Sequence, residues 1–271
     1  MKQALRTILN LLSYLFANEL GQKILQKTLT LNTYLMGVGS GSGVNESGEK
    51  VIFKKLLQIK KNDLIVFDVG ANQGQFLNMA FNNLKERSVE LHSFEPSKYT
   101  FDVLKSNKPK GANVLLNNFG LGKEENTLTL HYDDFASGLA SLTKRELEFK
   151  GISFEKTEQV QIKKLDEYCN KTNISEIDLL KIDVEGHEMD VLLGSRSFLE
   201  EKKIKLISFE FGGCNIDTRT YFKDFYYFLS DLGYTTYRIT PTGYCQKIDK
   251  YEELLEQFRT TNYLTVLENK G

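Results

Sequence analysis

The sequence lacks the cysteine content, the net charge and the long apolar run that would each indicate a class of protein. Three cysteines in 271 residues are widely spaced, which excludes a disulfide framework or a cysteine-rich zinc site. The 35 basic and 36 acidic side chains give a net charge of −1, so the total charge does not indicate binding to nucleic acid. We therefore predict free thiols in a reducing, cytoplasmic location and small or neutral partners rather than nucleic acid.

The longest apolar stretch near the N-terminus, residues 8–17, follows Lys2 and Arg6. It is too short to span a bilayer, and no small-residue cleavage site of a secretory signal follows it. Its apolar residues recur at helical intervals. We predict a helix that packs on the domain or on a partner, with peripheral membrane contact as the alternative and no transmembrane segment.

A glycine-rich segment, residues 37–49, separates this helical part from the rest of the chain. Such a segment is typical of a flexible linker, or of a lid whose glycine hinges allow closure over a ligand. The length suits one large α/β domain with an appendage. We predict a helical extension with its glycine-rich loop over residues 1–49 and a single domain over 50–271.

Apolar runs then alternate with helical patterns, which is typical of a mostly parallel sheet with helices on both faces. We predict a seven-stranded sheet whose last strand is antiparallel. Its strands are expected near residues 64–69, 89–95, 113–117, 177–183, 204–211, 234–239 and 262–267. Residues 126–163 are expected to form an insertion over the strand tips, where ligands bind in such sheets.

The first strand runs into a glycine turn and then a helix, within residues 64–84. Asp68 ends the strand, Gly70 and Gly74 allow close backbone approach, and Glu95 closes the next strand. Dinucleotide enzymes usually have three glycines here, to hold a pyrophosphate. An aspartate at the strand tip would repel pyrophosphate but suits the ammonium group of S-adenosylmethionine. The pattern therefore favours a methyl donor over a nicotinamide cofactor, with a ligand-free turn as the alternative.

A second group of polar residues, Asp183, Glu185 and His187, follows the strand near 177–183. Transfer of a methyl group to a hydroxyl needs an aligned nucleophile and a group that accepts its proton, or a bound cation. We interpret these three residues as catalytic, with helix capping as the alternative. Asp183 and Glu185 are also candidate ligands of a divalent cation such as Mg²⁺. Glu210 ends a further strand and is a candidate substrate-binding residue.

These motifs, in this order, resemble the FkbM family of S-adenosylmethionine-dependent methyltransferases. The resemblance is carried by residues 67–74, 94–97, 118–121, 137–142, 160–168, 177–194 and 209–210. It implies a Rossmann-like class I methyltransferase fold and hydroxyl groups of sugars or natural products as acceptors. By position it assigns the methionine part of the donor to Asp68, Gly70, Ala71, Asn72 and Gly74. Glu95 would hold the ribose, and Asn118 with Phe119 would flank the adenine. Asp183, Glu185 and His187 would face the acceptor.

The sequence thus predicts an O-methyltransferase that acts on a hydroxyl of a sugar, a glycan or a glycosylated metabolite. The alternative from another class is a catalytically silent protein that binds S-adenosylmethionine or serves as a scaffold in a glycan-assembly complex. Self-association is compatible with either function. The two functions differ in one measurable respect, since the silent protein would bind the donor without turnover.

Overall fold

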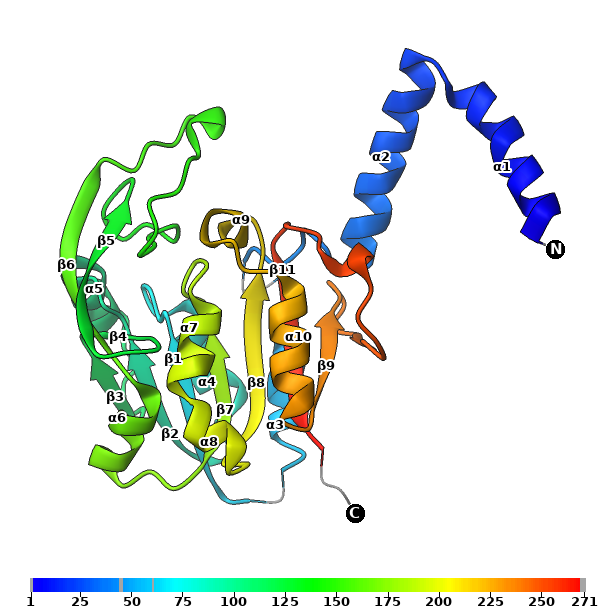
Figure 1. Cartoon of the computed structure of the whole chain (residues 1–271). Coiled ribbons are helices and arrows are strands. Elements are labelled where there is room, and N and C mark those ends of the chain that lie inside the picture. The colour runs from blue at the N-terminus through cyan, green and yellow to red at the C-terminus, as the bar shows by residue number, and fades with distance from the viewer. Residues whose placement is uncertain (1, 44–45, 60, 269–271) are drawn as a thin grey trace.

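The structure, a computed structural model, describes residues 2–43, 46–59 and 61–268. Its centre is an eight-stranded sheet of strand order β10-β9-β11-β8-β7-β1-β2-β3 (Figure 1). The strands are β1 (Asp63–Val69), β2 (Ser88–Phe94), β3 (Val114–Asn117), β7 (Ile177–Ile182), β8 (Ile204–Phe211), β9 (Tyr234–Ile239), β10 (Cys245–Lys247) and β11 (Thr261–Leu267). The strands β8, β7, β1, β2 and β3 pair with one another in parallel, in that order, whereas β11 runs antiparallel to β8 and β9. The seven predicted strands are confirmed, and the short β10 adds an edge.

Helices cover both faces of this sheet because successive residues of its strands point to opposite sides. In β1, the fully buried Val66 packs in one hydrophobic core and the fully buried Phe67 in the other. The Val66 side carries α3 (Lys50–Leu56), α4 (Gln75–Asn83) and α5 (Lys98–Asn107). The Phe67 side carries α6 (Leu165–Thr172), α7 (Glu188–Gly194), α8 (Arg196–Glu200) and α10 (Phe222–Asp231). This layering is the predicted Rossmann-like fold.

The predicted insertion is a small second sheet with the strand order β4-β6-β5. Its strands are β4 (Gly120–Leu121), β5 (Asn126–Tyr132) and β6 (Lys156–Lys163). The long loop between β5 and β6, residues 133–155, includes the 3-10 helix η1 (Glu148–Lys150). Two further short elements, α9 (Cys214–Thr218) and η2 (Glu253–Leu255), lie in the loops after β8 and before β11. These loops belong to the edge of the sheet at which the parallel strands end.

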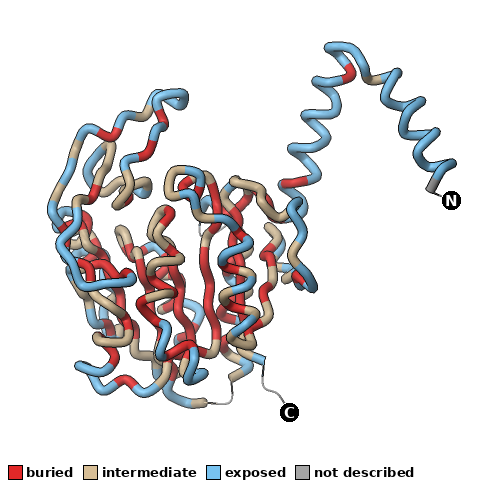
Figure 2. The backbone as a smooth tube through the Cα atoms, in the orientation of Figure 1, coloured by how far each residue is buried: buried red, intermediate tan, exposed pale blue. Residues whose placement is uncertain are grey.

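Two helices at the N-terminus, α1 (Lys2–Phe16) and α2 (Glu19–Leu35), project away from the sheet (Figures 1 and 2). In the described part of the chain, hydrogen bonds join these helices to the domain at the end of α2: the Arg259 guanidinium donates to the Thr33 hydroxyl at 2.7 Å, and that of Arg238 donates to the Met36 carbonyl at 2.8 Å. The expected packing of the first helix on the domain is therefore wrong. Within the described ranges, no helix is both long and apolar enough to cross a membrane.

The glycine-rich segment returns from α2 to the domain and packs on it over residues 37–41. The backbone N–H groups of Gly39 and Gly41 both donate to the Thr260 carbonyl, at 3.0 and 2.9 Å. The interpretation as a free linker does not describe this packing, since the segment forms part of a cavity wall. Closure of the segment as a lid stays a prediction, and residues 44–45 lie outside the described residues.

Candidate active site

Four acidic residues meet at one edge of the sheet because they follow the carboxyl ends of parallel strands. Asp68, Glu95, Asp183 and Glu210 belong to the ends of β1, β2, β7 and β8. Two cavities open at this edge, one of about 660 Å³ lined by Asp183 and Glu210 and one of about 90 Å³ lined by Glu95 and Asp183. The fully buried Asp68 lines neither cavity and lies next to Gly70, which lines both. The cavities share wall residues that include Asp183 and Gly70. The two cavities are therefore adjacent, with these residues between them.

The turn after β1 requires glycine at its first position. Gly70 has a φ of +81°, and a Cβ atom there would lie 1.8 Å from the Asp183 carbonyl oxygen. The amides of Gly70 and Ala71 both donate to the Phe94 carbonyl at 3.0 Å. Asn72 is also left-handed, with a φ of +46°. The turn thus brings the ends of β1 and β7 into direct contact, two residues after Asp68.

Asp68 is the most unusual group of the site because it is a fully buried carboxylate that lacks hydrogen bonds. Neither oxygen of Asp68 has a hydrogen-bond partner among the described residues. Lys181 Nζ lies 3.7 Å from Asp68 Oδ1, which is within ion-pair distance but too long for a hydrogen bond. Burial raises the pKa of Asp68 to about 6, although Lys181 opposes the shift. A buried carboxylate without donors is unfavourable. Its oxygens therefore suit a cationic, hydrogen-bonding ligand such as the ammonium group of S-adenosylmethionine.

Glu95 lines the smaller cavity and is held by the backbone. One carboxylate oxygen accepts from the Asn72 N–H and the other from the Ser97 N–H, both at 2.9 Å. Burial raises the pKa of Glu95 to about 7 against the effect of these two bonds. Each oxygen retains a further lone pair. Glu95, the predicted ribose-binding residue, is thus held in place by the backbone, and its oxygens can still accept hydrogen bonds from hydroxyl groups.

Asn118 and Phe119, predicted to flank adenine, do not line either of these cavities in the described part of the chain. The Asn118 amide donates to the carbonyls of Glu95 and Pro96, at 3.0 and 3.1 Å. The Phe119 ring packs on Phe94, with centroids 5.7 Å apart. The neighbouring residues 120–121 line the smaller cavity instead. Direct contact of Asn118 and Phe119 with a nucleoside stays a prediction.

Asp183, Glu185 and Glu210 form a carboxylate cluster in the larger cavity, with one oxygen of each within 4.8 Å of the others. Lys181 Nζ donates to Asp183 at 3.1 Å, and Arg145 Nη1 donates to Glu185 at 2.7 Å. Burial raises the pKa of Glu185 to about 8, and the nearby Asp183 adds to the shift. Burial also raises the pKa of Glu210 well above its usual range. The predicted catalytic acids and the predicted substrate residue therefore share one site.

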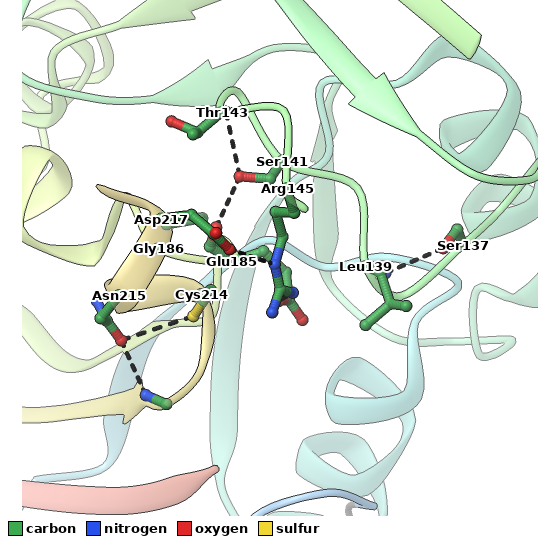
Figure 3. Close-up of polar contacts among 12 residues, drawn as sticks. Ser137, Leu139, Ser141, Thr143, Arg145, Glu185, Gly186, Cys214, Asn215 and Asp217 are labelled. Atoms are coloured by element: carbon green, nitrogen blue, oxygen red, sulfur yellow. Dashed lines mark hydrogen bonds and ion pairs between the residues drawn. The ribbon is translucent and has the colours of Figure 1, made fainter. Parts of the chain in front are cut away.

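Arg145 ties the long β5–β6 loop to this cluster (Figure 3). Its guanidinium also pairs with Asp217 of α9 at 3.2 Å. The Ser141 hydroxyl donates to the Glu185 carbonyl at 2.7 Å. Glu185 itself has a left-handed backbone, with a φ of +53°, a strained conformation for a residue with a side chain. The loop contacts thus stabilise a turn that presents Glu185 to the cavity.

His187 lies apart from the larger cavity and lines the smaller one. Its Nδ1 lies 2.8 Å from Asp190 Oδ2, and its Nε2 lies 3.0 Å from the Thr143 hydroxyl. Both ring nitrogens are therefore engaged, one by its own helix and one by the β5–β6 loop. These contacts give His187 a role in fixing that loop, while its role as a base stays a prediction.

Three site residues received no role from the sequence: Lys181, Arg145 and Glu49. Lys181 lies in β7, where every residue is buried. A lysine within such an apolar strand could have been recognised from the sequence as a candidate site residue. Glu49 lines the larger cavity, accepts from the Ser47 hydroxyl at 2.9 Å, and has a pKa that burial raises to about 7. Arg145 and Glu49 reach the site from loops, so no local pattern pointed to them.

Comparison with known proteins agrees with this arrangement. The Methyltransferase FkbM domain matches residues 68–236, which contain the end of β1 and all of β2, β7 and β8. The chain belongs to the FkbM methyltransferase family. Its match starts at Asp68, so Glu49 and the glycine-rich segment lie outside the matched region.

Relatives and solved structures are similar at low identity. Hexuronic acid methyltransferase AglP of Haloferax volcanii is 24% identical over 166 residues, 61% of this chain and 64% of that protein. The 2-O-methyltransferase NoeI of Sinorhizobium fredii is 21% identical over 154 residues, 54% of this chain and 63% of that protein. The structure of Methyltransferase FkbM from Methylobacillus flagellatus has a TM-score of 0.47 at 12% identity, over 92% of this chain and 61% of that one. The chain spans only 59–64% of the length of the curated relatives it matches.

Proposed function

We propose that this chain transfers a methyl group from S-adenosylmethionine to a hydroxyl oxygen of a sugar, a glycan or a glycosylated metabolite. Membership of a methyltransferase family supports the reaction class. The names of two relatives, a hexuronic acid methyltransferase and a 2-O-methyltransferase, support the acceptor class. The observation that carries the proposal is the buried Asp68 carboxylate, whose oxygens lack hydrogen bonds at the glycine turn.

The two cavities suit the two halves of this donor. In the proposal Asp68 binds the ammonium group, and Glu95 binds ribose hydroxyls in the smaller cavity. Lys181, beside Asp68 and Asp183, offers a cation to the donor carboxylate in the larger cavity. The larger cavity keeps room for an acceptor beyond the amino acid part of the donor. Gly70 and Asn72, which line both cavities, would then lie beside the sulfonium.

When bound, S-adenosylmethionine supplies a methyl group activated by a positively charged sulfur. Formation of the new carbon–oxygen bond breaks the carbon–sulfur bond, whose electron pair stays on sulfur, and releases the hydroxyl proton. Asp183 is our candidate for the group that accepts this proton, because it lines both cavities and its side chain is 37% exposed. Glu185 is held by Arg145 and would instead orient the acceptor. Alignment of acceptor and methyl group supplies much of the rate enhancement in such a displacement.

Titration calorimetry with S-adenosylmethionine and its demethylated product tests the binding step. We expect saturable binding to the wild type and loss of binding in Asp68→Asn, a variant that keeps the shape of the side chain. Transfer of a labelled methyl group to a panel of sugars and glycans then tests the reaction. Heat on titration with NADH but none with S-adenosylmethionine would contradict the proposal. Tight donor binding with no turnover on any acceptor would favour the silent binding protein.

The predicted divalent cation has a separate test. Asp183, Glu185 and Glu210 supply carboxylate oxygens of the type that Mg²⁺ prefers. Arg145 and Lys181 already balance part of this negative charge. Under the cation hypothesis, a chelator abolishes methyl transfer and added Mg²⁺ restores it. Activity that is unchanged by the chelator would remove the cation from the proposal and leave proton transfer to Asp183.

A further inference from the structure

The projecting helix α1 is exposed along most of its length (Figure 2), and its exposed side chains include an apolar face. Five large side chains at helical spacing form it and are 43–65% exposed: Leu5, Ile8, Leu9, Leu12 and Leu15. Helix α2 also exposes large apolar side chains, among them Leu20 and Leu29. Apolar surface of this kind marks a site of interaction. Because α1 touches the rest of the described chain chiefly through α2, the occupant must come from outside.

The charge of the two helices indicates what that occupant is. Residues 2–35 contain four basic side chains, Lys2, Arg6, Lys23 and Lys27, and one acid, Glu19, which gives +3. The whole chain carries −1, so the remaining residues carry −4. The near-zero total charge therefore conceals a basic, apolar appendage on an acidic domain. Two copies of this appendage would repel each other, whereas an anionic lipid surface would attract it.

We propose that α1 and α2 form a membrane-surface anchor that lies in the interface of an anionic bilayer. A helix with one apolar face and a basic polar face inserts its apolar side chains at the boundary of headgroups and acyl chains, without crossing the membrane. The acid-free composition of α1 and the absence of a spanning helix in the described ranges fit this geometry.

The anchor also fixes which side of the domain faces the lipid. The end of α2 is attached to Arg259 and Arg238 at the sheet edge where the strands β8 and β9 end. The chain then lines the larger cavity from Gly39 onward. Figure 1 shows α2 leaving the domain at the end of the sheet toward which β8 points. A bilayer bound by the two helices would therefore face the cavity side of the domain.

Co-sedimentation of the full chain with vesicles tests the anchor. We expect binding to vesicles of phosphatidylcholine with phosphatidylglycerol, and weaker binding to phosphatidylcholine alone. The variant Leu9→Asp/Leu12→Asp should lower partitioning about tenfold or more, because it removes two apolar contacts and adds negative charge. The variant Arg6→Glu/Lys27→Glu should abolish the preference for the anionic vesicles.

A matched control is Leu115→Asp, at a β3 position that is 39% exposed, against 43% for Leu12. It makes the same change far from the helices and should bind vesicles like the wild type. Equal sedimentation of the wild type and Leu9→Asp/Leu12→Asp would overturn the proposal. A different result would assign the apolar face to a second copy of the chain. In that case the wild type binds neither vesicle type and is a dimer by light scattering, and Leu9→Asp/Leu12→Asp is a monomer. Neither result depends on methyl transfer, so the anchor and the proposed function are tested separately.

Discussion

The cavity edge and the N-terminal helices depart from an ordinary globular protein in opposite ways. The cavity edge buries charge, with Asp68 fully buried and lacking hydrogen bonds. The helices expose apolar side chains, with Leu15 65% exposed. Each arrangement is unfavourable for an isolated chain, because burial of a carboxylate without hydrogen bonds and hydration of apolar surface both cost free energy. We propose that each region binds a partner, the ammonium group of the donor in the first and a membrane surface in the second.

The largest effect should follow from Gly70→Ala, since the added Cβ would meet the Asp183 carbonyl in a left-handed turn. We expect a loss of more than about 3 kcal/mol in the free energy of unfolding. Gly111→Ala is the matched control: its φ is +79° but no atom lies within 4 Å of the new Cβ, so it should lose only about 1 kcal/mol. Denaturant unfolding measures both. Similar losses would show that the cavity edge is no more constrained than an open loop.

Asp68→Asn should weaken donor binding and stabilise the free protein. Loss of a buried charge partner should weaken S-adenosylmethionine binding about a hundredfold or more. The same change removes a buried charge whose pKa is raised to about 6, so unfolding at about pH 8 should require about 1–3 kcal/mol more. Calorimetry and thermal unfolding measure the two effects. A variant that is less stable than the wild type would mean that the ion pair of Asp68 with Lys181 outweighs the cost of burying the carboxylate.

Stability of the ligand-free protein should fall as the pH rises. Glu49 and Glu95 have pKa values raised from 4.5 to about 7, so between these values the folded state binds more protons than the unfolded state. Their contribution is fully present below about pH 4.5 and is lost as the pH rises through about 7. Glu49→Gln should reduce the pH-dependent change in the free energy of unfolding by about 1–3 kcal/mol. Denaturant unfolding over a range of pH measures this change. A parallel curve for Glu49→Gln and the wild type would show that Glu49 titrates normally.

The smallest effect should come from the helices. Leu9→Asp/Leu12→Asp should change the free energy of unfolding in solution by less than about 0.5 kcal/mol, because both side chains are already exposed. Denaturant unfolding without vesicles measures this. A large loss would mean that the apolar face packs on the domain in solution, which would remove the contrast between the two regions.

The sheet and its ligand edge were predictable because buried parallel strands appear as apolar runs that end in polar residues. The runs before Asp68, Glu95, Asp183 and Glu210 sufficed to place four acids at one edge. Their partners were not predictable in this way. Arg145 arrives from the β5–β6 loop and Glu49 from the segment after α2, and contacts between distant loops leave no local pattern in the sequence.

Periodicity predicted the N-terminal helix correctly but not its surroundings. A repeat of apolar residues shows that one helical face avoids water, without showing what covers it. The domain or a partner was the expected cover for residues 8–17, and the structure places them away from the domain. The total charge of −1 was similarly uninformative, because the basic helices and the acidic domain cancel.

The most direct test of the central claim compares two ligands that differ only at the amino acid end. S-adenosylhomocysteine carries the ammonium and carboxylate groups, and 5′-methylthioadenosine lacks them, so the ratio of their dissociation constants isolates what Asp68 and its neighbours bind. We predict that the wild type prefers S-adenosylhomocysteine by about a hundredfold or more and that Asp68→Asn loses most of this preference. An unchanged ratio in Asp68→Asn would contradict the assignment of the buried carboxylate to the donor.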